Sequence, residues 1–100
     1  MITHTDIKNR ISEKFGSNSF EVFKLIEEKS KEFDYLNNPR IVRCILFLSD
    51  NNFEKLKEYI DAAINDPRDV MFWAEYENID DINNTKRVRD FNKTFDESTI

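Results

Sequence analysis

Apolar residues ahead of position 77 recur at intervals of three and four, the period of an α-helix that buries one face. Ile7, Ile11 and Phe15 repeat at intervals of four, with charged residues between them. Gly16, the only glycine of the chain, follows directly. Because glycine readily adopts the left-handed conformation that commonly ends a helix, a first helix ending at Phe15 is predicted. Its candidate N-caps are Thr3 and Thr5.

The most apolar stretch of the sequence reads NPRIVRCILFLSD and begins at Asn38. Seven of the nine positions after Pro39 are apolar, and only Arg40 and Arg43 interrupt them. Asn38 suits the N-cap of a helix, and Pro39 suits its first position, where the missing N–H is not needed. A helix that is apolar on nearly all sides must be buried, so the helix over residues 39–49 is predicted to form the centre of a bundle.

Three further helices are predicted around this central one. Their apolar stripes run from Phe20 to Leu36, from Phe53 to Ile64 and from Pro67 to about Tyr76. Their start signals are capping-box spacings at Asn18 and Glu21 and at Asn51 and Glu54, and a cap followed by proline at Asp66 and Pro67. Val70–Trp73 has the composition of a strand, but no partner strand is evident, so a helix is predicted there too.

Beyond the fifth helix no long apolar face continues. Val88, Phe91 and Phe95 are spaced so that a short helical turn or an extended arm lays them on the bundle. The last few residues are predicted to be a disordered tail, and the order of residues 77–85 stays open. The predicted division is a helical bundle over residues 1–76 and a C-terminal arm or tail over residues 77–100, partly docked on the bundle.

The amino-acid composition limits which fold class and which cellular compartment are expected. One glycine and two prolines are too few turn-formers for a many-stranded β-fold. We therefore predict an all-α, compact bundle of five helices around a buried central helix, with a C-terminal arm. No apolar run has the length of a membrane span or a signal peptide, and the single cysteine, Cys44, permits no internal disulfide. A cytoplasmic protein is expected, with Cys44 as a buried structural thiol.

The residues that common catalytic and metal sites require are scarce. His4 is the only histidine, and with one distant cysteine it cannot complete a closed zinc site or a nucleophile–base pair. Asp80 and Asp81 lack the ligand spacing of a calcium loop, and there is no glycine-rich loop to bind a phosphate. The expectation is a protein that is not an enzyme and uses no cofactor or metal.

Charged residues of the helices are candidates for structural ion pairs. A mostly buried helix cannot leave a guanidinium unpaired, so Arg40 and Arg43 are expected to meet carboxylates. The candidate ion-pair residues are Arg40, Arg43, Arg68 and Asp69, and the carboxylates considered for the arginines are Asp66, Asp69 and Glu75. Such a cluster is favoured over an anion-binding site.

Aromatic residues next to acidic ones indicate where a partner binds. Phe72, Trp73 and Tyr76 are flanked by carboxylates, a composition typical of interface anchors with a charged rim. The candidate partner-binding residues are Trp73, Glu75, Tyr76, Glu77, Asp80 and Asp81. For Trp73 the favoured alternative is a core position against the third and fourth helices, whereas for Tyr76 the two alternatives are balanced. Phe20 and Phe23 offer a second candidate surface.

Four segments carry a resemblance: Arg43–Leu48 (RCILFL), Asp66–Val70 (DPRDV), Ala74–Tyr76 (AEY) and Arg87–Phe91 (RVRDF). Together they resemble a pattern found in small uncharacterised bacterial helical proteins, with no named activity. The resemblance spans about half of the chain. It implies that Arg87–Phe91 is an integral part of the fold.

Net charge sets the expected partner. A formal charge of −5 disfavours nucleic acids and anionic membranes, so a basic or neutral protein is expected. An acidic domain without catalytic residues fits an immunity-like or antitoxin-like inhibitor of a basic toxin, such as a nuclease. Two alternatives stay open. One is a self-associating helical regulatory module, and the other is a nucleic-acid accessory protein that uses Lys86–Lys93. The protein is expected to be a monomer or a weak homodimer.

Overall fold

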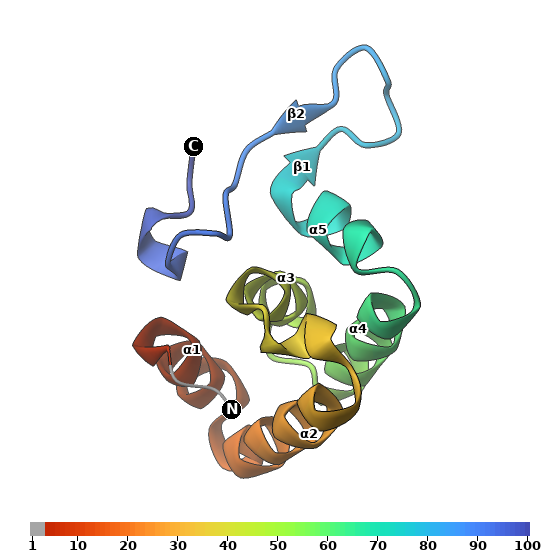
Figure 1. The fold of residues 1–100 in the computed structure, drawn as a ribbon. Helices are drawn as coiled ribbons and strands as arrows, with labels where there is room; N and C mark the ends of the chain where they lie inside the picture. Colours follow the sequence, from red (N-terminus) through yellow and green to blue (C-terminus); the bar gives the residue numbers. More distant parts are fainter. Residues whose placement is uncertain (1–3) are drawn as a thin grey trace.

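Five α-helices and a short antiparallel hairpin make up most of residues 4–100, the part of the chain that this computed structural model describes (Figure 1). The elements are α1 (Thr5–Phe15), α2 (Ser19–Glu32), α3 (Pro39–Ser49), α4 (Phe53–Asn65), α5 (Pro67–Glu75), β1 (Tyr76–Glu77) and β2 (Lys86–Arg87). The protein is mostly helical, in agreement with the predicted all-α class, but the hairpin departs from a purely helical fold. Within the described residues no helix is long and apolar enough to cross a membrane.

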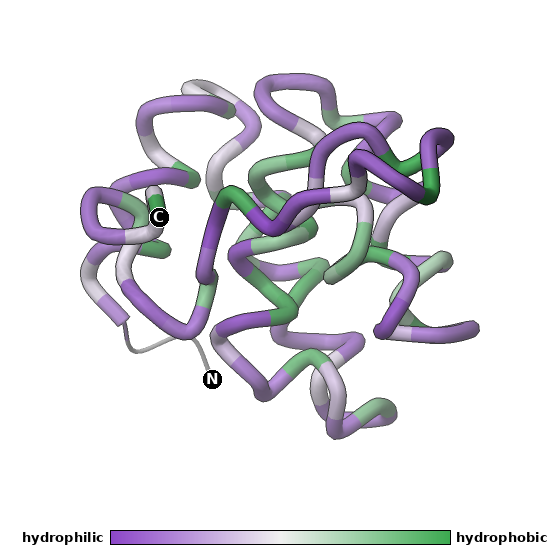
Figure 2. The backbone as a smooth tube through the Cα atoms, turned by 90° about the horizontal axis from the view of Figure 1, so that it is seen from above, coloured by the Kyte–Doolittle hydropathy of each residue, from purple (hydrophilic) through white to green (hydrophobic). Residues whose placement is uncertain are grey.

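The helix α3 is buried on most of its surface and packs against α1, α4 and α5 (Figure 1). It begins as predicted, because Asn38 accepts a hydrogen bond from the backbone N–H of Arg40 at 2.9 Å, with Pro39 in the first turn. Its fully buried apolar residues are Ile41, Val42, Cys44, Ile45 and Leu46. Many hydrophobic segments gather in the middle of the molecule, and the outer turns are mostly hydrophilic, with a few hydrophobic stretches among them (Figure 2).

Two other helix ends lie where the sequence predicts them. Gly16 follows α1 with a φ of 48°, in the left-handed region that glycine adopts without strain. Asp66 caps α5 by accepting the backbone N–H of Arg68 at 3.0 Å. Because this start is strong, the helix continues through the strand-like residues after Val70 and ends at Glu75.

Two predicted caps, Thr5 and Asn51, are wrong. Thr5 is the first residue of α1, behind an N-cap at His4 that makes no side-chain hydrogen bond. Asn18 is the N-cap residue of α2, as predicted, but its side chain makes no capping hydrogen bond. At the start of α4 the cap is Asn52 rather than Asn51, and it accepts the backbone N–H of Lys55 at 3.0 Å. The other candidate cap of α1, Thr3, lies outside the described residues.

Residues 88–100, which we call the C-terminal segment, pack on the helices. The ring of Phe91 is buried, and its centroid lies 5.4 Å from that of Phe47 on α3. The backbone N–H of Ile100 donates to the carbonyl oxygen of Val88 at 3.1 Å. The predicted docking of Phe91 is therefore observed, whereas the predicted disordered tail is wrong, because the last residues are tied to the rest of the segment by backbone hydrogen bonds.

Candidate protein-binding surface

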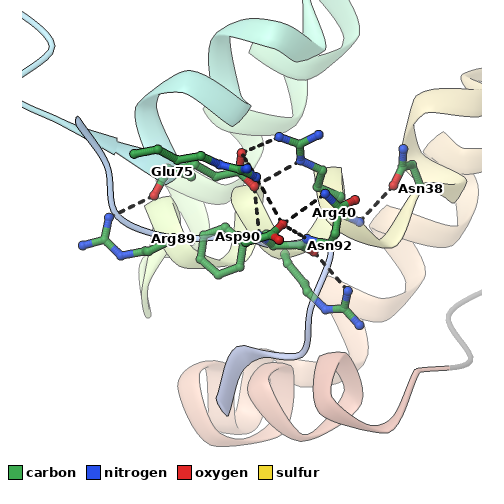
Figure 3. Close-up of polar contacts among 10 residues, drawn as sticks. Asn38, Arg40, Glu75, Arg89, Asp90 and Asn92 are labelled. Carbon is green, nitrogen blue, oxygen red and sulfur yellow. Dashed lines mark hydrogen bonds and ion pairs between the residues drawn. The ribbon is translucent and has the colours of Figure 1, made fainter. Parts of the chain in front are cut away.

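The carboxylate of Glu75, at the end of α5, is fully buried and bonded from three directions (Figure 3). Arg40 of α3 donates to it through Nε, at 3.1 Å, and through Nη2. Arg87 Nη2 lies 3.3 Å from Oε1, and the backbone N–H of Phe91 donates to Oε2 at 2.9 Å. The predicted pairing of Arg40 with Glu75 is confirmed. The prediction of Glu75 as a partner-binding residue is wrong, because no partner can reach a side chain with no exposed surface.

A second ion pair, between the buried Arg43 and the partly buried Asp6, joins α3 to α1. Arg43 donates from Nε and Nη2 to the carboxylate of Asp6 at 2.8 and 3.1 Å, and from Nη1 to the carbonyl oxygen of Phe91 at 3.1 Å. Arg43 is thus paired as predicted, but with Asp6 instead of the carboxylates considered from the sequence. The prediction missed Asp6 because the sequence does not show which helix packs beside Arg43, and only the packing of α1 on α3 brings the two residues together.

The pair expected at the start of α5 lies at the surface. Arg68 binds Asp66 in a bidentate manner, at 3.0 and 2.8 Å. Its hydrogen bonds hold the pKa of the Asp66 carboxyl below its usual value. Asp69 forms no ion pair with any residue of the range 4–100, so its place in the predicted cluster is wrong.

Both buried networks hold the C-terminal segment in place. Glu75 accepts the backbone N–H of Phe91, Arg43 donates to its carbonyl oxygen, and Asp6 accepts the backbone N–H of Phe95 at 3.2 Å. Polar backbone groups that leave water must find partners, and these three side chains supply them. The ionic residues of the interior therefore stabilise the fold, and a binding surface has to be sought elsewhere.

Cys44 lies inside the same interior. Burial raises the pKa of its thiol to about 12, and the negative charge of Glu75 acts in the same direction. A thiol that stays protonated is a poor nucleophile, which agrees with the predicted structural role. Among residues 4–100, no group of three or more histidine, cysteine or carboxylate side chains is arranged to hold a metal ion.

Aromatic side chains of α5 reach the surface. Phe72 is 39% exposed, and its ring centroid lies 5.2 Å from that of the half-buried Tyr76. Trp73 is 40% exposed and meets Tyr59 of α4 edge-on, with 6.3 Å between centroids. The favoured prediction that Trp73 fills the core is therefore wrong. Phe72 and Tyr76 border a shallow hollow of about 470 Å³, together with Met71 and the end of Arg40.

The loop between β1 and β2 presents two further apolar side chains, Ile79 and Ile82, and Ile82 is 91% exposed. Hydrogen bonds within the loop fix its shape. Asp81 accepts the backbone N–H of Asn83 at 3.1 Å and the side-chain amide of Asn84, and the hydroxyl of Thr85 donates to the carbonyl oxygen of Asp81 at 2.9 Å. The question of order in this loop, which the sequence left open, is answered by these bonds.

The acidic residues predicted to bind a partner differ in whether they already form ion pairs or hydrogen bonds within the protein. Glu77 pairs with Arg89 at 3.3 Å, and Asp81 is used within its own loop. Asp80 is exposed and, among residues 4–100, forms no ion pair. The basic stretch Lys86–Lys93 contains two arginines, and both form ion pairs within the protein: Arg87 with Asp90 at 3.1 Å and Arg89 with Glu77. Of the acidic set, Asp80 is thus the residue left for a partner.

One short stretch of chain, residues 72–82, carries the exposed residues and the half-buried Tyr76 that we call the α5–hairpin surface: Phe72, Trp73, Tyr76, Ile79, Asp80 and Ile82. Sequence reasoning missed Ile79 and Ile82. The available signal was their position as single apolar residues among turn-forming Asn and Asp. No protein-family model, curated protein or solved structure matches the chain. The resemblance noted above therefore stays a prediction, and the function has to be argued from the surface itself.

Proposed function

We propose that the protein is a non-enzymatic protein-binding domain and that its partner contacts the α5–hairpin surface. One observation carries this proposal. Seven large apolar side chains are exposed among residues 4–100, and four of them, Phe72, Trp73, Ile79 and Ile82, come from one short stretch of chain. Several exposed apolar side chains in one segment are typical of protein-binding sites, where aromatic residues act as anchors.

The fixed shape of the hairpin loop supports the same proposal. A loop that is ordered before binding loses less conformational entropy when a partner immobilises it. The hydrogen bonds of Asp81 and Thr85 hold the loop while Ile82 points into solvent. Such a side chain suits insertion into an apolar pocket of a partner.

The charge of this region favours a basic or neutral partner. Asp69 and Asp80 are exposed, and neither is in an ion pair among the described residues. Arg68, which is exposed at the start of α5, is already neutralised by Asp66. Together with the net charge of −5, this supports an immunity-like or antitoxin-like inhibitor of a basic toxin, such as a nuclease.

Affinity capture from the native host tests the proposal. The tagged protein is compared with a Trp73→Ala/Ile82→Ser variant and with Phe20→Ser, which removes an exposed aromatic from α2, outside the α5–hairpin surface. We expect one basic protein to co-elute with the wild type and with Phe20→Ser and to be lost with the double variant. Calorimetry on the purified pair is expected to show weaker binding as salt concentration rises.

The inhibitor class makes a stricter prediction. One equivalent of the domain is expected to abolish the activity of the captured partner, and the double variant is expected not to. If the partner stays fully active when it is saturated with the domain, the protein-binding proposal stands but the proposal of an inhibitor is wrong. Capture of the same proteins by all three forms would count against the α5–hairpin surface as a whole.

A further inference from the structure

A second exposed apolar site lies on α2, away from the α5–hairpin surface. Phe20 is 74% exposed, more than any other aromatic residue among those described. It borders a shallow hollow of about 310 Å³ lined by Phe20, Phe23, Lys24, Glu27, Glu28 and Lys31. In Figure 1, α2 lies at the lower edge of the molecule, so its outer side is open to another molecule.

The six lining residues form one stripe along the helix. At 3.6 residues per turn, they fall within an arc of about 140°. The stripe contains two lysines and two glutamates, and its formal charge is zero. Their spacing permits ion pairs within the helix, yet among residues 4–100 none of the four forms one. Four unpaired charges beside an exposed aromatic ring are available to a partner.

The order of these residues along α2 is self-complementary. When two copies of a helix pair antiparallel about a two-fold axis, positions equally far from the axis face each other across it. With the axis between Leu25 and Ile26, every lining residue faces another lining residue. Lys24 faces Glu27 of the second copy, Phe20 faces Lys31 of the second copy, and Phe23 faces Glu28 of the second copy.

We propose that two copies of the protein associate through α2 in this antiparallel arrangement. Two symmetry-related ion pairs between Lys24 and Glu27 form next to the axis, and each Phe20 ring lies against the ammonium group and aliphatic stem of Lys31 of the second copy. A strongly basic or strongly acidic partner would leave two of the four charges facing like charge. A second copy pairs Lys24 with Glu27, places Lys31 against Phe20, and puts no like charges opposite each other, and this decides between the occupants.

The proposed interface is small. A helix of 14 residues is about 21 Å long, and a contact between two such helices falls below the roughly 1,200 Å² of a standard stable interface. We therefore expect a weak dimer whose population rises with protein concentration. Because it uses α2, this association is separate from the partner binding proposed for the α5–hairpin surface, and either can fail without the other.

Sedimentation velocity of the purified chain over a wide concentration series tests the proposal. The wild type is expected to shift from monomer towards dimer. Phe20→Ser is expected to lower the association constant about tenfold or more, the loss typical of an interface anchor, whereas Trp73→Ser leaves it unchanged. Because Phe20 and Trp73 are both exposed, circular dichroism is expected to show both variants folded.

Charge exchange gives the sharper test. Lys24→Glu places a glutamate opposite Glu27 at both symmetry-related contacts. Glu27→Lys places a lysine opposite Lys24 at both contacts. Because like charges repel, each variant alone is expected to be monomeric. An equimolar mixture of the two is expected to dimerise, because every facing pair in the mixed dimer is then opposite in charge. The proposal is overturned by a wild type that remains monomeric throughout, and equally by a mixture that associates no better than its components.

Discussion

At the scale of single residues, Glu75 is the most consequential side chain. It is a carboxylate with no exposed surface, and it stands between two guanidinium groups and a backbone N–H. A buried charge is tolerated only where partners replace the water it has lost. Arg40 comes from α3, whereas Arg87 and Phe91 come from the chain after α5, so the burial of this one residue depends on both parts being packed together.

Replacing the carboxylate by its neutral isostere measures this dependence. Glu75→Gln keeps the shape of the side chain but leaves Arg40 without its counter-charge and Arg87 with Asp90 alone, and we expect the free energy of unfolding to fall by about 2–4 kcal/mol. Glu77→Gln removes an exposed partner of Arg89 and is expected to cost less than about 1 kcal/mol. Urea denaturation of both variants makes the comparison, and equal losses would contradict the structural role assigned to Glu75.

The sequence does not show which individual side chains are buried, and this limited the prediction of their roles. The sequence offered Glu75 both as a counter-ion for Arg40 and as part of an acidic rim for a partner, and nothing in its neighbours separates the two roles. The same limit applies to Trp73, which the pattern favoured for the core and which is exposed. A helical period shows that residues share a face, but how much of that face is covered depends on distant segments.

At the scale of elements, most of the helices were predictable because their signals are local. Asn38–Pro39 and Asp66–Pro67 each join a capping side chain to a residue that fits the first turn, and both predicted starts are observed. The hairpin was not predictable in this way. Its two-residue strands are too short to show alternation, and their pairing joins Tyr76 to Arg87 across a long loop.

The start of α4 shows how one residue decides a cap. Asp50 takes a φ of 54°, so the turn after α3 uses one residue more than a capping-box pattern suggests, and the cap moves to Asn52. We expect Asn52→Ala to lower the free energy of unfolding by about 1 kcal/mol and Asn51→Ala to change it by less than about 0.5 kcal/mol. Thermal or urea unfolding measures both losses of stability. A larger loss for Asn51→Ala than for Asn52→Ala would show that Asn51 is the cap.

At the scale of the whole molecule, the first described helix and the last residues of the chain are joined through one carboxylate. Asp6 on α1 binds Arg43 of the central helix and accepts the backbone N–H of Phe95, 89 positions further along the sequence. Contacts this far apart in sequence form only when the intervening helices are packed. The Asp6–Arg43 pair is therefore a sensitive reporter of the complete fold.

This pair also makes stability depend on pH in a defined direction. Burial by itself raises the pKa of Asp6, but the hydrogen bond and charge of Arg43 and the N–H of Phe95 outweigh it, so the folded pKa lies below the ordinary 3.8. A lowered folded pKa means that the stabilisation is complete above 3.8 and is lost as pH falls through the folded value. Wild type and Asp6→Asn should therefore differ most near neutrality and converge in acid.

Urea denaturation between neutral and strongly acidic pH measures that convergence. Near neutrality we expect Asp6→Asn to lower the free energy of unfolding by about 3 kcal/mol, because Arg43 is left buried without a counter-charge. Asp96→Asn, which removes an exposed carboxylate from the same C-terminal segment, gives the reference for a general change in net charge. In strong acid Asp6 is protonated and can no longer form an ion pair with Arg43. If the wild type stayed as much more stable than Asp6→Asn there as it is near neutrality, Asp6 would act through packing alone.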